Sequence, residues 1–223
     1  MNGDTPKRNG LTVKVGMHTP WGVADSVTPI IDGMWSVGTP SHGGIYLRPD
    51  LNAQIPDYMQ HGGEYERGLW FVGWYEEDCD WCIPFLVFEG RILMETRDPY
   101  AVKNINEGAH KRTLKNWHPA AWERFFGVEL QPGESYIRDQ ETFNAENAAR
   151  LVVVAATGHP CSYLPTRPGF CYCLARIGGH GQTNANNGTE RAFLIPTEEY
   201  DKRGRYGFVI ADPNKYEEVP AKV

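Results

Sequence analysis

The sequence predicts an α+β fold, in which largely antiparallel β-sheets pack against a few helices around a single core. Two observations favour this fold. Short segments with alternating apolar side chains lie near both ends of the chain, and the longest helical pattern lies between them. The chain has 223 residues, of which 41% are hydrophobic, and this is enough to bury one core.

A polar segment opens the chain, and a β meander follows it. We expect residues 1–10 to form a flexible tail ahead of one domain that spans residues 11–223. Residues 11–47 alternate apolar and polar side chains, which is typical of short antiparallel strands. Within them, Asp32-Gly33 predicts a hairpin turn, because glycine adopts the positive φ that such turns need.

Helical signals occupy the middle of the chain. Pro49 is expected in the first turn of a short helix that ends near Met59. A second helix is expected to begin near Trp74, with acidic residues close to its N-terminus, where the helix dipole favours them. Pro84 is expected to end or kink that helix. Asn116–Phe126 predicts a further helix.

The last part of the chain returns to β-structure. Residues 139–156 form the longest helical pattern, although Val152–Val154 is also compatible with a short strand. A polar Gly/Asn-rich loop, expected to be mobile, covers residues 178–188. Strands are predicted at 169–177, 189–196 and 207–211. We expect them to join the meander in one sheet, or in two packed sheets, with the long helix covering one side.

Charge and composition exclude several classes of protein. The net charge of −6 argues against a direct nucleic-acid ligand, which requires a basic face. The longest apolar stretch, Leu151–Ala156, is too short to cross a bilayer, and the residues after Met1 do not resemble a signal peptide. We therefore expect a cytoplasmic protein with no membrane contact. Its oligomeric state is left open.

The segment Ser41–Gly44 is the first candidate for chemistry. Two glycines allow a close approach of the backbone to a ligand or to another element, and His42 can act as acid or base near neutral pH. The alternative is a plain tight turn in which the histidine is a solvated or hydrogen-bonded bystander. The segment Thr19–Gly22, with Trp21, accompanies this candidate.

The acidic segment Trp74–Trp81 is the second candidate. On the expected helix, Glu76 and Asp80 share one face, where two carboxylates can bind a divalent cation or act as acid and base. The alternative is that the acids stabilise a helix N-terminus on a wet surface. The flanking tryptophans indicate that the segment is not fully exposed.

Cysteine spacing suggests a zinc site, but we do not predict one. Cys79 and Cys82 form a C-x-x-C pattern, and Cys171 and Cys173 form a C-x-C pattern. No turn glycine follows Cys82, as it would in a zinc knuckle, so buried free thiols are the expectation. The sequence therefore predicts no metal and no cofactor.

The chain resembles an uncharacterised domain family carried on alphaproteobacterial plasmids, integrative elements and phages. The residues that match are Thr19–Gly22, Asp32-Gly33, Ser41–Gly44, Trp74–Cys79, Phe193–Pro196, Glu199–Asp201 and Gly207–Ile210. One departure is Cys82, where a small apolar residue is expected. The resemblance implies a mobile-element setting and no particular activity.

Two functions follow as hypotheses. The first is an accessory protein of a phage or plasmid that binds a host or defence component through an aromatic, mildly acidic surface, including an anti-defence role. The second is a small hydrolase or transferase. Its catalytic residues would be His42, Glu76, Glu77 and Asp78, and its binding residues Trp21, Ser41, Gly43, Gly44, Trp74 and Tyr75. The second requires His42 to lie beside the acidic segment, and we expect the two to be neighbours. They would form either a pocket with Trp21, Trp74 and Tyr75 as walls or a buried polar clasp between sheet and helix.

Overall fold

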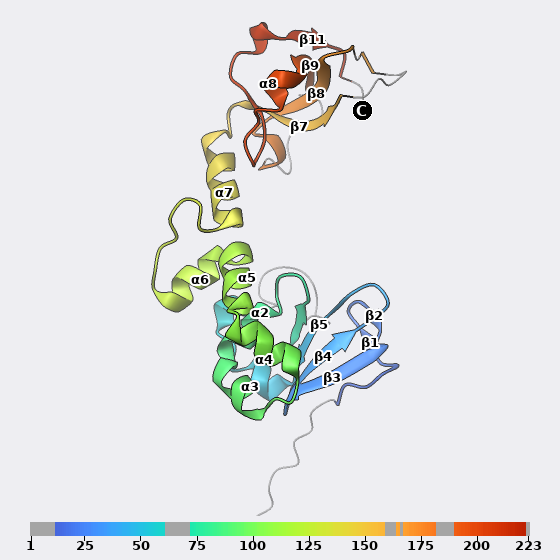
Figure 1. The fold of residues 1–223 in the computed structure, drawn as a ribbon, viewed down its shortest axis with the longest axis vertical. Coiled ribbons are helices and arrows are strands. Elements are labelled where there is room, and N and C mark those ends of the chain that lie inside the picture. Colours follow the sequence, from blue (N-terminus) through green and yellow to red (C-terminus); the bar gives the residue numbers. More distant parts are fainter. Residues whose placement is uncertain (1–11, 61–71, 159–163, 166, 182–189, 222–223) are drawn as a thin grey trace, which may run out of the picture. The chain divides into compact units, whose positions relative to one another are not determined.

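The computed structural model divides the chain into two units, Met1–Ser135 and Tyr136–Val223. It describes residues 12–60, 72–158, 164–165, 167–181 and 190–221. The predicted tail at 1–10 and most of the predicted loop at 178–188 lie outside these residues. Figure 1 shows antiparallel strands and helices in the chain, so the α+β fold class is confirmed.

A four-stranded antiparallel sheet, in the order β3-β4-β5-β6, forms the centre of unit 1. A two-stranded hairpin, β1-β2, accompanies it. The strands are β1 His18–Thr19, β2 Gly22–Val23, β3 Ser26–Ile31, β4 Met34–Gly38, β5 Gly43–Leu47 and β6 Trp74–Glu76. Asp32-Gly33 turns between β3 and β4 with φ +88° at the glycine, as predicted.

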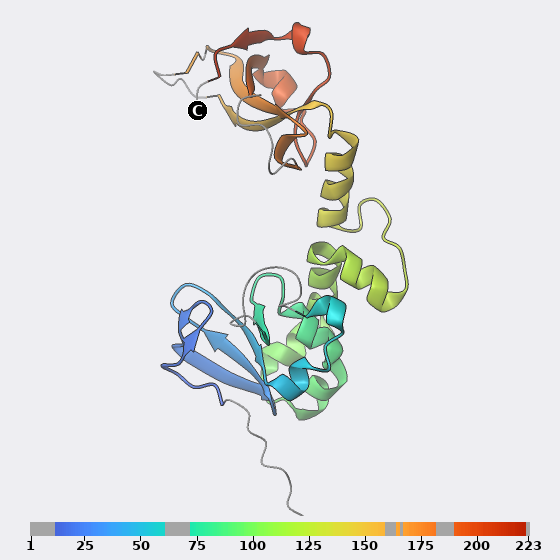
Figure 2. The same ribbon diagram turned by 180° about the vertical axis from the view of Figure 1, so that it is seen from behind.

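Short helices cover one face of this sheet, as Figures 1 and 2 show from opposite sides. They are α1 Pro49–Asn52, η1 Asp57–Met59, α2 Cys82–Val87, α3 Glu89–Glu95, α4 Pro99–Asn106, α5 Ala109–Trp117 and α6 Pro119–Phe126. Met34, Ile45 and Tyr75 face the helices in the larger apolar cluster. Tyr46 and Trp74 face the other way and pack with Trp21. The sheet therefore buries both faces.

Unit 2 contains a five-stranded antiparallel sheet in the order β10-β7-β8-β9-β11. Its elements are α7 Tyr136–Glu146, β7 Leu151–Thr157, β8 Phe170–Ile177, η3 Gly179–Gly181, β9 Arg191–Pro196, α8 Thr197–Tyr200, β10 Val209–Ile210, η4 Pro213–Lys215 and β11 Glu217–Val219. Cys171, Cys173 and Ala175 alternate toward one apolar cluster, since every second residue of a strand shares a face.

The prediction of a single core was wrong. Every residue of the larger cluster in unit 1 precedes residue 130, and every residue of the cluster on β7–β10 follows residue 150. The meander and the C-terminal strands form separate sheets in separate units. Alternating patterns show that a strand needs an apolar partner face, but they do not say which one.

Two predicted helices were also wrong. The segment from Trp74 begins as strand β6 and a turn, and the helix starts only at Cys82. Pro84 lies in the first turn of α2, where a missing N–H leaves no intrahelical bond unmade. The predicted helix 139–156 ends at Glu146, and Val152–Val154 lies in β7, in agreement with the alternative. β-Branched residues favour strands.

The remaining helix predictions were met in part. Pro49 starts a helix, but the segment up to Met59 is split into α1 and a short 3-10 turn. Pro119 and Gly127 bound α6 as predicted from Asn116–Phe126, and Gly127 has φ +66°. In the described part of the chain, no helix combines the length and the apolar character that a bilayer crossing needs.

Candidate functional site

Two groups of polar side chains lie at the end of strand β6 in unit 1. The outer group consists of His42, Glu76 and Glu77, and the inner group consists of Cys79, Asp80 and His118. Within each group, one candidate ligand atom of every residue lies within 4.8 Å of the others. Among the described residues, these are the groups of three that have the spacing of metal ligands.

The outer group brings His42 beside the acidic segment, as the sequence predicted. The cause is strand pairing and not the expected helix. Gly44 pairs with Glu76 in the β5–β6 ladder, and the Glu77 N–H donates to the Gly43 carbonyl at 3.1 Å. His42 immediately precedes β5, so the pairing sets its side chain next to both carboxylates.

The two glycines of this segment allow close packing of other elements. A Cβ atom on Gly44 would lie 2.2 Å from the Tyr75 carbonyl oxygen and 2.4 Å from the Trp21 ring. A Cβ atom on Gly43 would lie 2.9 Å from the Val37 carbonyl oxygen and 2.7 Å from a Glu77 carboxylate oxygen. Distances below about 3 Å are steric clashes, so only glycine fits at both positions.

Trp21 reaches Gly44 from the β1–β2 hairpin. The Thr19 hydroxyl oxygen accepts the Trp21 N–H at 3.1 Å, and the hydroxyl donates to the Gly22 carbonyl at 2.9 Å. The Trp21 ring meets Trp74 edge to face, with centroids 5.6 Å apart. Trp21 and Trp74 therefore form one aromatic surface beside the outer group.

Tyr75 does not belong to that surface, which corrects the expectation of three aromatic walls. Neighbouring residues of a strand point to opposite faces, so Tyr75 faces the helices while Trp74 faces Trp21. Its hydroxyl donates to the Asn52 side chain at 2.7 Å, and its side chain is fully buried. Burial raises the pKa of this phenol.

Ser41 and Asp78 are exposed, and neither belongs to either group. Ser41 lies in the turn that leads to β5. The Thr39 side chain closes this turn, because its hydroxyl donates to the His42 carbonyl at 2.7 Å. Asp78 contributes its backbone, whose N–H donates to Glu76 at 2.7 Å. The Asp78 carboxylate is therefore not grouped with the acids with which it was predicted to act.

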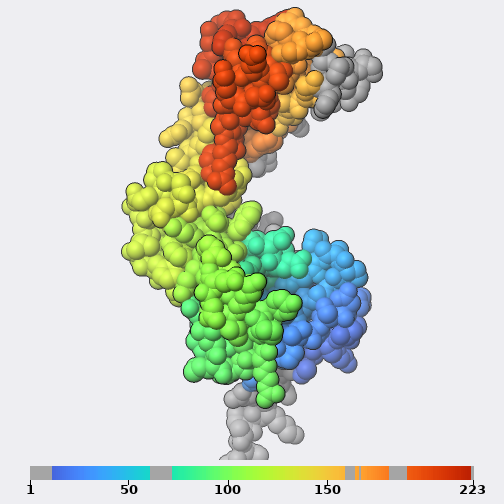
Figure 3. Space-filling model, viewed as in Figure 1, coloured from blue at the N-terminus to red at the C-terminus, as the bar shows by residue number. Residues whose placement is uncertain are grey.

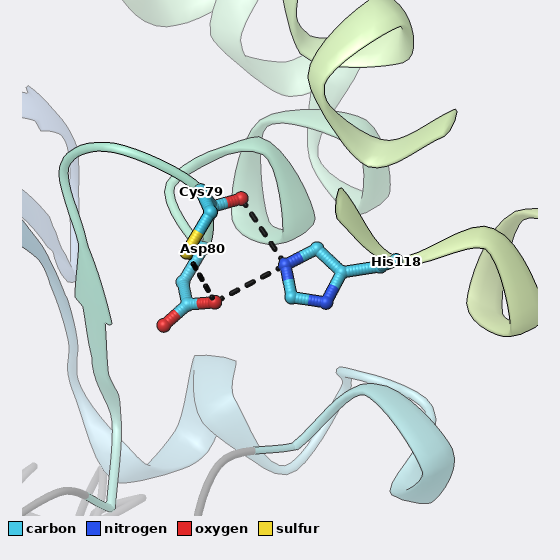
Figure 4. Close-up of side chains that lie close together, drawn as sticks. All are labelled: Cys79, Asp80 and His118. Carbon is cyan, nitrogen blue, oxygen red and sulfur yellow. Dashed lines mark hydrogen bonds and ion pairs between the residues drawn. The ribbon is translucent and has the colours of Figure 1, made fainter. Parts of the chain in front are cut away.

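The inner group is shown in Figure 4. His118 Nε2 lies 3.1 Å from Asp80 Oδ1 and 3.2 Å from the Cys79 carbonyl oxygen. The Cys79 thiol lies 3.4 Å from the same Asp80 oxygen. Asp80 is buried, and Cys79 and His118 are half-buried. Two distant segments, the turn after β6 and the corner between α5 and α6, meet here.

The surroundings of the Cys79 thiol favour its protonated form. Burial, and then the nearby carboxylates of Asp80 and Glu76, raise the pKa of this thiol to about 12. A thiol in that state is a poor nucleophile at neutral pH, because only the thiolate attacks. The Cys79, Asp80 and His118 arrangement is therefore not a cysteine-nucleophile site as it stands.

Sequence reasoning missed the inner group. His118 is 39 residues away from Cys79, and the helix expected from Trp74 placed Asp80 beside Glu76. The available signals were Cys79-Asp80 in the acidic segment and a histidine directly before Pro119. Neither signal gives a distance. Of the other cysteines, the structure describes Cys82, Cys171 and Cys173, which are free and buried as predicted, whereas Cys161 lies outside the described residues.

Comparison with known proteins identifies the family. A family model described as a domain of unknown function, DUF7007, matches residues 14–148. The chain therefore belongs to this family, and both groups at the end of β6 lie within the matched part. No curated protein and no solved structure matches the chain.

Proposed function

We propose that the protein is an accessory protein of a mobile genetic element that binds a host or defence protein through the end of helix α6. The observation that carries this proposal is a set of exposed apolar side chains. Phe125, Phe126 and Val128 are 39%, 38% and 50% exposed. A contiguous group of exposed apolar residues often indicates an interaction site. Figure 3 shows the α5–α6 segment at the surface of unit 1.

Contacts with neighbouring aromatic side chains hold the Phe125 and Phe126 rings in place. The Phe126 ring packs at a tilt against Trp122, with centroids 4.2 Å apart, and Trp122 packs against the larger apolar cluster. Phe125 meets Phe126 edge to face, with centroids 5.0 Å apart. The Arg124 guanidinium, directly before these rings in the sequence, lies over the Tyr58 ring, 4.0 Å from its centroid. Rigid aromatic anchors lose little conformational freedom on binding, so the fitting partner is a protein with an apolar groove.

Two other observations support the mobile-element setting and the choice of a protein as partner. The resemblance to a family carried on plasmids, integrative elements and phages supports the mobile-element and anti-defence part of the proposal. The net charge of −6 favours a protein partner over a nucleic acid.

The test is capture from a host lysate by the full chain as bait. We expect one protein to be retained by the wild type and by Met94→Ser, which changes an exposed apolar residue on α3. Phe125→Ser should lose it. Equal capture by Phe125→Ser, or no partner at micromolar bait, contradicts the proposal. Self-association that Phe125→Ser abolishes also contradicts it, because the surface then binds a second copy.

The outer group favours a second candidate, a small hydrolase or transferase. His42 with Glu76 and Glu77 has the proximity that an acid–base pair needs. Turnover of ester or phosphoester substrates by the wild type, with loss in His42→Ala at an unchanged melting temperature, would support it. Absence of turnover leaves the binding proposal as the better account.

A further inference from the structure

Three side chains of the kinds that bind zinc meet between the turn after β6 and the corner of α5 and α6. They offer one thiol, one carboxylate and one imidazole. From this geometry we infer that Cys79, Asp80 and His118 bind a zinc ion. The inference departs from the metal-free chain that the sequence predicts, and it is independent of the partner surface on α6.

Two of the three donor–donor distances are close to those around a tetrahedral ion. Donor atoms at about 2.0–2.3 Å from zinc, at the tetrahedral angle, lie roughly 3.3–3.7 Å from one another. The carboxylate and imidazole atoms are 3.1 Å apart, and the thiol and carboxylate atoms are 3.4 Å apart. The thiol and imidazole atoms lie within 4.8 Å. A shift of about an ångström or less in the thiol–imidazole separation, with smaller shifts in the other two, brings the three donors around one ion.

The backbone fixes the donors from the turn. The Asp80 N–H donates to the Glu76 carbonyl at 3.1 Å, and the Ile83 N–H donates to the Asp80 carbonyl at 2.9 Å. The Glu76 carboxylate accepts the Cys79 N–H at 3.2 Å. Glu76 is therefore a positioning residue for the turn.

Backbone hydrogen bonds also hold the main chain of His118, which carries the imidazole. The His118 N–H donates to the Leu114 carbonyl at 2.8 Å, and the His118 carbonyl accepts from Trp122 at 2.9 Å. His118 thus ends α5 and starts α6. Donors held in place before the metal arrives lose little conformational entropy on binding.

The donor set selects zinc over magnesium or calcium. Hard cations prefer oxygen donors only, whereas a thiolate with an imidazole and a carboxylate suits zinc. Binding breaks the sulfur–hydrogen bond of Cys79, forms a sulfur–zinc bond and releases one proton to solvent. Three protein donors leave a fourth position, for water or for Glu76, whose Oε2 lies 3.6 Å from the thiol.

The experiment is a zinc titration of the full chain after treatment with a chelator. We expect about one zinc ion per chain, and a melting temperature raised by about 5 °C or more at ~100 times Kd. Magnesium should have no effect. Cys79→Ser and His118→Ala should each weaken zinc binding by more than about 100-fold. Loss of a residue that only hydrogen-bonds to a metal ligand costs about 10–100-fold, and loss of a ligand itself should cost more.

Matched controls separate this site from its neighbours. Asp78→Asn changes an exposed acid on the same turn, and His42→Ala removes the histidine of the outer group. Both should bind zinc as the wild type does. Loss of binding in His42→Ala, with retention in Cys79→Ser, would move the ion to the outer group and overturn the inference.

A spectroscopic measurement on the wild type tests the inference even if the variants fail to fold. Cobalt(II) substituted for zinc should give a sulfur-to-metal charge-transfer band and the intense visible bands of a tetrahedral ion. Absence of the sulfur band, or of any zinc uptake, overturns the inference.

Discussion

The outer and inner groups share one strand end, but they differ in burial. His42 and Glu77 are exposed to solvent, whereas Asp80 is 7% exposed and meets His118 between two packed segments. A polar contact in water contributes little to stability, because solvent and salt screen it. When one partner of a buried polar contact is removed, the other is left buried without a hydrogen-bond partner, and this destabilises the fold. The inner group should therefore hold the fold, and the outer group should be available for chemistry.

Gly44→Ala should have the largest effect, because it disturbs the frame that carries both groups. Its Cβ atom would meet backbone at 2.2 Å and the Trp21 ring at 2.4 Å. We expect a loss of about 3 kcal/mol in the free energy of unfolding, measured by urea titration. Gly90→Ala is the matched control, since no atom lies within 4 Å of its Cβ position in α3. That variant should be neutral or more stable by up to ~1 kcal/mol. Equal effects of the two substitutions would refute the packing argument.

Asp80→Asn measures the inner group directly. It removes the charge beside His118 and leaves the shape, so we expect a loss of about 2 kcal/mol with a chelator present. Asp78→Asn, on the exposed side of the same turn, should stay within about 0.5 kcal/mol of the wild type. If both variants are equally stable, burial does not distinguish the two acids and the comparison fails.

A buried histidine away from both groups extends the comparison with a pH dependence. His110 is fully buried, its Nε2 lies 3.3 Å from Glu89, and Lys111 lies 2.9 Å from the same carboxylate. Burial raises the pKa of the Glu89 carboxyl, but hydrogen bonds from Lys111 and His110 outweigh it and hold the pKa below its usual value. The stabilisation is therefore complete above the unfolded pKa, and it is lost as the pH falls through the lower folded pKa.

Glu89→Gln should destabilise the protein by about 1 kcal/mol at neutral pH, and the difference should vanish in acid. Denaturant titrations at several pH values measure this. A Glu89→Gln defect that grows as the pH falls would reverse the sign and refute the assignment.

His42→Ala should have the smallest effect on stability. The contacts that hold His42 in its turn are made by its backbone with the Thr39 side chain, and alanine keeps them. We expect a change below about 0.5 kcal/mol. A loss well above 1 kcal/mol would show that the outer group is a structural clasp and not a site.

Local patterns in the sequence predicted local structure well. The Asp32-Gly33 turn and the strands β8 and β9 follow from turn chemistry and alternation. The division into two cores did not follow, because an alternating strand shows only that it needs a partner. The acidic segment was predicted as a helix from its charges, whereas pairing with β5 makes Trp74–Glu76 a strand.

The two groups were not equally predictable. The glycine pair beside His42 indicated a close approach, and the structure supplies Trp21 and Glu77 as the elements that approach. Nothing near His118 in the sequence indicates Cys79 or Asp80. Their meeting depends on how the α5–α6 corner packs against the turn, and that is a property of the whole unit.

X-ray absorption at the zinc edge tests the central claim most directly, because sulfur distinguishes the two groups. The inner group contains one thiol, and the outer group contains only nitrogen and oxygen donors. For the zinc-loaded full chain we predict one sulfur neighbour at about 2.3 Å, with nitrogen and oxygen neighbours at about 2.0–2.2 Å. A spectrum with nitrogen and oxygen neighbours alone would contradict the account, because the ion would then lie outside the Cys79, Asp80 and His118 group.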